Sequence, residues 1–318
     1  MKKKLSALLL AAIMVLSLTA CGGKNENYNV GIIQLVQHPA LDAATQGFRA
    51  ALTEKLGDKV SFDEQNASGD VPACAIIANQ LVSAKVDLIM ANATPALQAA
   101  QSATAEIPVL GTSVTDYATA LGIEGWTGVT GKNISGTSDL APLDQQAAVL
   151  NELFPDAKNV GILYCSAEPN SKYQSDVITE YLTGMGYACR EYTFSDSNDL
   201  QTVAVAAAAE SDVIYLPTDN TVASNTEIIK NVCVPVGVPI VAGESGICAG
   251  CGVATLSISY YDLGYATGLM AYEILVNGAD PATMEIQCAP PFTKQYNAEI
   301  SEALGVTIPS DYEAIAAE

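Results

Sequence analysis

The sequence predicts an α/β fold whose parallel β-sheets are covered by helices and divided between two similar lobes. Three observations support this prediction. Short β-rich runs alternate with helical stretches almost throughout the chain, which is the pattern of parallel strands connected by helices. The first half of this pattern recurs in the second half. The chain has 318 residues, a length that favours two domains or one large one.

The alternation defines the individual elements. In the first half we expect strands over residues 30–35, 60–66, 88–91 and 108–112, and helices over residues 41–56, 72–83 and 95–104. An irregular stretch follows. The second half is expected to contain strands over residues 160–164, 188–193, 213–216 and 239–242, and helices over residues 144–154, 173–185, 200–211 and 222–232.

The internal repeat is visible as short strings at matching positions. Residues 29–33 read Asn-Val-Gly-Ile-Ile, residues 159–163 read Asn-Val-Gly-Ile-Leu, and Pro39 and Pro169 follow at the same distance. Any two strand–helix units can share strings this short. The shared order of several units nevertheless favours a duplication, with two similar lobes that face each other.

The N-terminus is typical of an exported protein. Three lysines at positions 2–4 precede an apolar run over residues 5–18, as in a secretory signal, and this run is shorter than the roughly 20 residues of a membrane-spanning helix. Cys21 then follows Leu-Thr-Ala, which resembles the bacterial lipobox. We expect a signal peptide over residues 1–20, lipid attachment at Cys21, a polar tether over residues 21–27 and a location on the outer side of the cell membrane. The alternative is an ordinary cleaved signal with an unrelated cysteine.

Charge excludes several classes of function. The chain has 14 Lys and Arg residues against 35 Asp and Glu residues, and removal of the three signal-peptide lysines leaves 11 against 35, a formal charge of −24. Such a surface repels nucleic-acid phosphates and anionic lipid headgroups. We therefore expect no nucleic-acid partner and no membrane contact except through the lipid.

Seven cysteines follow Cys21, and an odd number leaves at least one thiol unpaired. Cys248 and Cys251 have the C-x-x-C spacing of zinc ribbons and thioredoxins. A zinc site would want a second such pair, and His38 is the only imidazole. We expect a structural pair, with or without a disulfide, although a redox or metal role remains open at this point.

Polar side chains gather in the loops that follow equivalent strands of the two halves, where open parallel sheets bind ligands. The candidate ligand-binding residues are Gln34, His38, Thr94, Thr115, Asp116, Ser166, Glu168, Asn170, Thr218, Asp219, Asn220 and Glu244. Residues 34–41, 92–95, 166–171 and 217–220 contain no Lys or Arg, which excludes a polyanionic cargo such as a sugar phosphate. Asp219 has an alternative role as the N-cap of the next helix.

Enzyme motifs are missing. A Ser-His-Asp hydrolase would have to use His38, and no Gly-x-Ser-x-Gly sequence occurs. Residues 128–132 faintly resemble a phosphate-binding loop, but Trp126 and Asn133 occupy positions where Walker A needs Gly and Ser or Thr. We therefore expect a binding protein that is not an enzyme and uses no cofactor.

The chain shares several short runs with a known family, at residues 31–42, 65–70, 93–95, 114–116, 133–139, 168–171, 217–220 and 243–244. As a set they resemble the ABC-transporter substrate-binding lipoproteins of the type I periplasmic-binding-protein fold, in the group that includes tryptophan and tyrosine uptake proteins. One departure affects the geometry of a loop: the family usually has Thr-Asp-Pro where this chain has Thr115-Asp116-Tyr117.

The resemblance implies two Rossmann-like lobes joined by three crossovers, which we expect near residues 133–139, 257–261 and 288–292. Lobe one would comprise residues 28–136 and 262–289, and lobe two residues 137–261 and 290–318. Ligand would bind between the lobes, and a hinge motion would close them around it.

The resemblance also implies that the protein captures a small solute for an ABC permease and ATPase complex. We expect a monomer that binds an aromatic or other apolar amino acid. In this interpretation Asp219 pairs with the ligand ammonium, Thr94, Thr115 and Ser166 hold its carboxylate, and Gln34, Val36, His38 and Tyr117 line the slot for its side chain. The alternatives are a nucleoside or sugar as cargo, and a lipoprotein that senses a ligand without transport.

Overall fold

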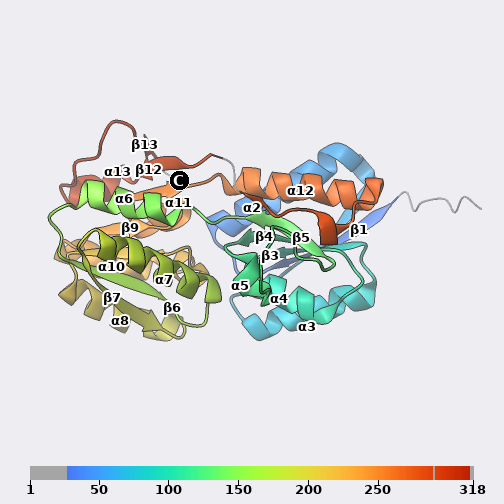
Figure 1. Cartoon of the computed structure of the whole chain (residues 1–318), viewed down its shortest axis with the longest axis horizontal. Coiled ribbons are helices and arrows are strands. Elements are labelled where there is room, and N and C mark those ends of the chain that lie inside the picture. The colour runs from blue at the N-terminus through green and yellow to red at the C-terminus, as the bar shows by residue number, and fades with distance from the viewer. Residues whose placement is uncertain (1–26, 289–290, 316–318) are drawn as a thin grey trace, which may run out of the picture.

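The computed structural model of the protein describes residues 27–288 and 291–315 and consists of two α/β lobes that lie side by side (Figure 1). The sheet of lobe one has the strand order β11-β5-β4-β3-β1-β2, with every pair parallel. Its strands are β1 (Tyr28–Gln34), β2 (Val60–Asn66), β3 (Leu88–Asn92), β4 (Val109–Val114), β5 (Ile134–Ser138) and β11 (Gln287–Cys288).

The sheet of lobe two has the strand order β13-β12-β10-β9-β8-β6-β7. Its strands are β6 (Asn159–Cys165), β7 (Ala188–Phe194), β8 (Val213–Leu216), β9 (Ile240–Ala242), β10 (Ala254–Ser257), β12 (Thr293–Tyr296) and β13 (Glu313–Ala314). Strand β12 pairs antiparallel with β10. The order β7-β6-β8-β9-β10 repeats the order β2-β1-β3-β4-β5 of lobe one, so the two halves of the chain share one topology.

The strands of lobe one carry apolar side chains on both faces of their sheet, and helices therefore cover both faces. Val30 and Ile32 of β1 pack toward α2 (Pro39–Leu56) and α12 (Tyr260–Asn277). Ile33 packs on the opposite face with α3 (Val71–Ala84), α4 (Thr94–Ala103) and α5 (Tyr117–Leu121). Figure 1 shows α2 and α12 on one side of this sheet and α3 and α4 on the other.

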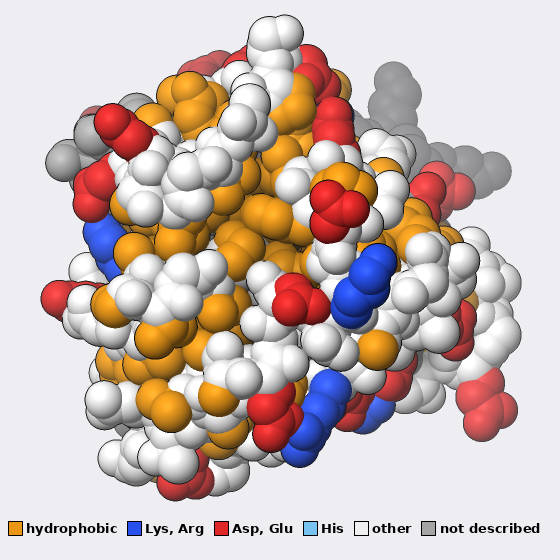
Figure 2. All heavy atoms as spheres, turned by 90° about the vertical axis from the view of Figure 1, so that its left-hand side faces the viewer, with side chains coloured by type: hydrophobic (Ala, Val, Ile, Leu, Met, Phe, Trp, Pro, Cys, Tyr) orange, Lys and Arg blue, Asp and Glu red, His pale blue; other side chains and the backbone are white. Residues whose placement is uncertain are grey.

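The sheet of lobe two is covered in the same way. Helices α6 (Leu143–Leu153), α7 (Pro169–Gly184) and α13 (Ala298–Ala303) pack on one face. Helices α8 (Ser197–Glu210), α10 (Thr226–Cys233) and α11 (Ser245–Cys251) pack on the other, and the short α9 (Asn220–Ala223) follows β8. On the end face of this lobe, hydrophobic side chains lie among polar ones, with acidic and basic side chains scattered between them (Figure 2).

The chain passes between the lobes three times: after β5, between β10 and α12, and between β11 and β12. Helix α12 therefore belongs to lobe one although it follows a strand of lobe two. The predicted fold class, two parallel-sheet lobes joined by three crossovers, is confirmed. Within the described residues, no helix is both long and apolar enough to cross a membrane. The predicted signal peptide and Cys21 lie outside these residues.

Candidate functional site

A small cavity lies between the lobes, where the carboxyl ends of strands from both sheets face each other. Its volume is about 10 Å³. Both lobes line it, and so does the first residue of α12 at a crossover. The lining residues are His38, Ala40, Leu41, Ser113, Thr115, Asp139, Asn170, Thr218, Asp219, Asn220, Ala223, Glu244 and Tyr260. We call this space the inner cavity.

The inner cavity is acidic. Asp139, Asp219 and Glu244 are buried in its wall, and no Lys or Arg lines it. Burial raises the pKa of Asp139 to about 6, against the opposing effect of the nearby Tyr260 and Thr115 hydroxyl groups. Burial also raises the pKa of Glu244 to about 7. Burial, with the Glu168 carboxylate nearby, raises the pKa of Asp219. The cavity is therefore suited to a cationic group.

Two of these carboxylates cap helices. Asp219 accepts the N–H of Val222 at the start of α9, and its other oxygen accepts the N–H of Cys165 and the hydroxyl of Ser171, each at 2.8 Å. Glu244 accepts backbone N–H groups at the start of α11. The structure thus shows Asp219 in its alternative role, as the N-cap of α9. Both of its oxygens are occupied by lobe-two donors.

Other polar atoms of the inner cavity have no hydrogen-bond partner of normal geometry. They are His38 Nδ1, Ser113 Oγ, Asp139 Oδ1 and Asn170 Oδ1, all buried. Burial of an unpaired polar atom costs free energy. Ser113 also has a φ of 53°, a strained value for a residue with a side chain, beside an irregularity in the pairing of β4 with β5. Unpaired atoms and local strain at one place indicate a ligand site.

The N-terminus of α2 faces the same cavity. Ala40 and Leu41 line the cavity in the first turn of this helix. His38 is the N-cap residue but makes no side-chain capping bond, and Pro39 follows it. The N–H groups of a first turn have no partner within their helix, and the helix dipole is positive there. Lobe one therefore offers an anion-binding helix end, whereas α9 and α11 of lobe two are capped by carboxylates.

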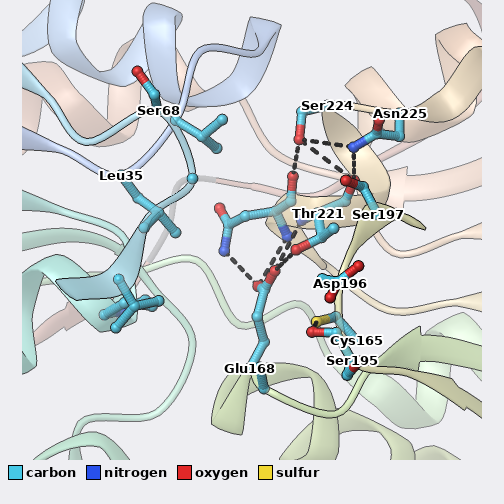
Figure 3. A pocket seen from close by; sticks show the side chains of 16 residues that line it. Leu35, Ser68, Cys165, Glu168, Ser195, Asp196, Ser197, Thr221, Ser224 and Asn225 are labelled. Atoms are coloured by element: carbon cyan, nitrogen blue, oxygen red, sulfur yellow. Dashed lines mark hydrogen bonds between the residues drawn. The ribbon is translucent and has the colours of Figure 1, made fainter. Parts of the chain in front are cut away.

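A larger cleft of about 390 Å³ lies beside the inner cavity, and Asn220 lines both spaces. We call it the outer cleft. Leu35 and Ser68 approach it from lobe one, opposite Glu168 of lobe two (Figure 3). Glu168 is buried. It accepts the N–H and the hydroxyl of Thr221, both at 2.8 Å. These hydrogen bonds satisfy donors in the first turn of α9.

Two side-chain hydrogen bonds connect the lobes near the cavity. His38 Nε2 lies 3.3 Å from Asn220 Oδ1, and Gln174 Nε2 donates to Thr115 Oγ1 at 3.5 Å. These two long contacts connect the lobes at the site.

The structure brings most of the predicted site residues together. The inner cavity is lined by His38, Thr115, Asn170, Thr218, Asp219, Asn220 and Glu244, and Glu168 lines the outer cleft. These residues converge because they follow the carboxyl ends of neighbouring parallel strands.

Four predicted residues line neither space. The Gln34 side chain is hydrogen-bonded to α2: it donates to Asp42 at 2.6 Å and accepts from Thr45 at 2.7 Å. Asp116 caps α5 through the N–H of Thr119. The Ser166 side chain is exposed and donates to the Phe194 carbonyl at 3.1 Å. Thr94 is buried as the first residue of α4.

Tyr117 does not line a slot for a ligand side chain. It is buried in the core of lobe one, and its hydroxyl donates to the Thr137 carbonyl at 3.1 Å. The tyrosine that lines the inner cavity is Tyr260.

Sequence reasoning missed the apolar lining residues of the inner cavity and three that carry polar side-chain groups: Ser113, Asp139 and Tyr260. Asp139 gave a signal, because it is a carboxylate in a polar run at a predicted crossover. Ser113 gave none, because it belongs to a strand whose other side chains are buried. Tyr260 reaches the cavity only through the packing of α12.

Cys248 and Cys251 are buried free thiols among apolar side chains of lobe two, so no disulfide joins them. No group of metal-ligating side chains occurs in residues 27–288 and 291–315.

Comparison with known proteins agrees with this architecture. The family model described as ABC transporter substrate binding protein matches residues 29–318. A tyrosine-binding protein of Clostridioides difficile (strain R20291) is 38% identical over 291 residues, which are 86% of this chain and 84% of that protein.

Solved structures agree as well. A structure from Streptococcus pneumoniae described as an ABC domain in complex with L-Trp has a TM-score of 0.87 and 31% identity, and covers 91% of this chain and 100% of that one. The ligand-free, open structure of a substrate-binding protein from Clostridium difficile has a TM-score of 0.70 and 37% identity, with 92% and 100% covered. The chain belongs to the ABC transporter substrate-binding protein family and is a solute-binding protein, not an enzyme.

Proposed function

We propose that the protein captures an aromatic amino acid in the inner cavity and delivers it to the permease and ATPase of an ABC importer. The main support for this proposal is that the cavity has both an anion-binding helix end and buried groups that favour a cation. An uncapped helix N-terminus faces it from lobe one, and buried carboxylates and unpaired acceptors surround it. These are complementary to a zwitterion. The relatives named for tyrosine and for L-Trp support the aromatic class of cargo.

The ligand carboxylate belongs at the N-terminus of α2. First-turn N–H groups and the positive end of the helix dipole favour an anion. Ser113 Oγ and the Thr115 hydroxyl, which both line the cavity, supply further donors. In this arrangement Thr94 and Ser166 take no part.

The ligand ammonium belongs at Asp139. One oxygen of this carboxylate accepts the Tyr260 hydroxyl at 2.9 Å, and the other, with the Thr115 hydroxyl nearby, has no partner of normal hydrogen-bond geometry. Both oxygens of Asp219 already accept hydrogen bonds from lobe two, so Asp219 is not the direct partner of the ammonium in this arrangement. Asp139 therefore replaces Asp219 as the expected partner of the ammonium.

The apolar part of the ligand packs against Ala40, Leu41, Ala223 and Tyr260. A cavity of about 10 Å³ has room for about one water molecule, so an amino acid enters only when the lobes move apart. We therefore propose that the three crossovers act as a hinge between lobe one, with β5 and α12 whole in it, and lobe two.

Titration calorimetry with the twenty amino acids, several sugars and several nucleosides tests the proposal. Burial of an indole or phenol ring contributes on the order of 2–3 kcal/mol, so tryptophan, tyrosine or phenylalanine should bind far more tightly than alanine. Tight binding of a sugar or nucleoside, with every amino acid inactive, would contradict it.

We further propose that Cys21 carries a lipid that anchors the protein outside the cytoplasm. The sequence Leu-Thr-Ala-Cys at residues 18–21 supports this. A Cys21→Ser variant should lose metabolic labelling with palmitate and appear in the medium. Retention of the variant on membranes would contradict the anchor.

A further inference from the structure

Glu168 determines the orientation of two asparagine side chains beside the inner cavity. Its Oε2 accepts from Asn220 Nδ2 at 2.7 Å and from Asn170 Nδ2 at 3.2 Å. Glu168 is the acceptor in every one of its hydrogen bonds, which also include those from Asn220 N–H and from Thr221. Both asparagines must therefore turn their NH₂ groups toward Glu168 and their amide oxygens away from it.

The first consequence concerns Asn170. Its NH₂ group also donates to the Thr218 carbonyl at 3.0 Å, so the assignment of its nitrogen does not depend on Glu168 alone. Asn170 Oδ1 remains buried without a partner in the wall of the inner cavity. It is therefore a free acceptor on a residue that lines the cavity.

The second consequence concerns His38, the only histidine of the chain. Asn220 turns Oδ1 toward His38 Nε2, 3.3 Å away. An amide oxygen is an acceptor, so Nε2 must carry the hydrogen. Burial lowers the pKa of His38, which favours the neutral ring. Nδ1 is then an unprotonated acceptor, and it too is buried without a partner at the inner cavity.

We propose that Glu168 is a positioning residue that makes the inner cavity selective for a primary ammonium group. By fixing Asn170 and Asn220, and His38 through Asn220, it leaves His38 Nδ1 and Asn170 Oδ1 as acceptors on residues that line the cavity. Asp139 Oδ1, which does not depend on Glu168, is a third acceptor. A primary ammonium has three N–H donors. This inference rests on the proposed function, because it requires an amino acid as ligand.

The inference names a chemical distinction that aromatic packing alone would not produce. N-methylation of tyrosine removes one donor and adds bulk at the nitrogen, and 3-(4-hydroxyphenyl)propanoate has no ammonium at all. Loss of one hydrogen bond to a charged group corresponds to roughly a tenfold or greater loss of affinity. Wild-type protein should therefore prefer L-tyrosine over N-methyl-L-tyrosine by about tenfold or more, and should bind the propanoate still more weakly.

Nitrogen NMR of protein labelled with ¹⁵N-histidine gives a readout that a purely structural role of Glu168 would not change. Because His38 is the only histidine, two ring-nitrogen signals report its state. In the complex with L-tyrosine we expect a protonated Nε2 and an unprotonated Nδ1 whose resonance moves when the ligand binds. A doubly protonated ring, the opposite tautomer, or an Nδ1 resonance that does not respond to ligand would overturn the inference.

Two variants test the connection to Glu168. Glu168→Gln brings an NH₂ donor that competes with the oriented asparagine amides, and Asn220→Leu removes the bridge to His38. Both should populate the other tautomer and reduce the preference for L-tyrosine over its N-methyl derivative by about tenfold. Glu180 is exposed in α7, the helix that begins directly after Glu168. Glu180→Gln should change neither the tautomer of His38 nor the preference for L-tyrosine. An unaltered tautomer and unaltered preference in both test variants would overturn the inference.

The outcomes separate the two proposals. If neither tyrosine nor tryptophan binds the wild-type protein, the proposed function fails and this inference falls with it. If tyrosine binds but the imidazole has the wrong tautomer, only the inference fails.

Discussion

At the residue scale, Asp139 carries the sharpest prediction for binding. Asp139 lines the inner cavity, one of its oxygens is buried without a hydrogen-bond partner, and the other accepts the Tyr260 hydroxyl. Asp139→Asn retains an acceptor for Tyr260 but removes the charge. Hydrogen bonds to charged groups contribute about 1.5–3 kcal/mol, so calorimetry should show roughly 10- to 100-fold weaker binding of the amino acid.

Asp116→Asn is the matched control. Asp116 caps α5 outside both spaces, and Asn caps a helix about as well as Asp. Circular dichroism should confirm that both variants are folded. Equal affinities of the two variants would remove Asp139 from the site.

The buried carboxylates also predict how stability depends on pH. Burial raises the pKa values of Asp139 and Glu244, to about 6 and about 7, and that of Asp219. The folded state then binds more protons than the unfolded state between about pH 4 and these raised values. By linkage, the free energy of unfolding should fall as pH rises from 5 to 8, on the order of 1 kcal/mol per pH unit.

His38 opposes this trend, because burial lowers its pKa, but it is one group against three. Urea unfolding at pH 5, 6.5 and 8 measures the effect, and Asp139→Asn should flatten part of the slope. A free energy of unfolding that rises steadily with pH over this interval would show that burial does not raise the pKa values of these carboxylates.

Sequence reasoning could place much of the site because the carboxyl ends of parallel strands converge. His38 and Asp219 were found in this way. It could not say what each side chain does there: Asp219 turns both oxygens into its own lobe. It could not find Ser113, because the residue types of β4 do not reveal that one of its residues has a left-handed backbone conformation.

At the element scale, the contact between α2 and α12 supports the site. The two helices approach closely through glycines: a Cβ on Gly264 would lie 1.9 Å from the Ala44 carbonyl oxygen, and one on Gly47 would lie 2.0 Å from the Tyr261 carbonyl oxygen. The N-terminus of α2 and Tyr260 of α12 both line the inner cavity. The same contact therefore sets the packing of lobe one and the shape of the site.

Gly264→Ala should destabilise the protein although Ala normally favours a helix over Gly. The added methyl group meets backbone, which cannot move aside, and overpacking typically costs about 1–3 kcal/mol. Urea unfolding measures the loss, and affinity should fall as well. Gly184→Ala at the end of α7 is the control, because its added Cβ meets nothing within 4 Å and stability should be unchanged or slightly higher.

The strand and helix pattern was largely predictable, and where it failed a local cause can be named. Strands β2 and β8 have the predicted bounds. The helix predicted over residues 222–232 is divided into α9 and α10. Ser224 donates to the Asn220 carbonyl at 2.7 Å and Asn225 Nδ2 to the Thr221 carbonyl at 2.8 Å, and such side-chain bonds compete with helix continuation. The antiparallel β12 joins its sheet through a long-range pairing that residue types do not reveal.

At the scale of the whole molecule, the lobes stand close together. His38 and Gln174 bond across the site, and the inner cavity is small. We expect this close arrangement to be a closed form of the protein, which an open form precedes when ligand enters.

Small-angle scattering tests whether ligand drives this closure. The inter-lobe bonds are few and leave four buried polar atoms unpaired, so without ligand the closed form gains little over an open form whose polar groups are hydrated. A ligand that bridges α2 and Asp139 contacts both sides of the hinge and stabilises only the closed form. The radius of gyration should therefore decrease on addition of the aromatic amino acid. The same scattering data give the molecular mass of the particle, which tests the predicted monomer. An equal radius with and without bound ligand would mean that the lobes close without it, and the amino acid would then have to enter by a local opening.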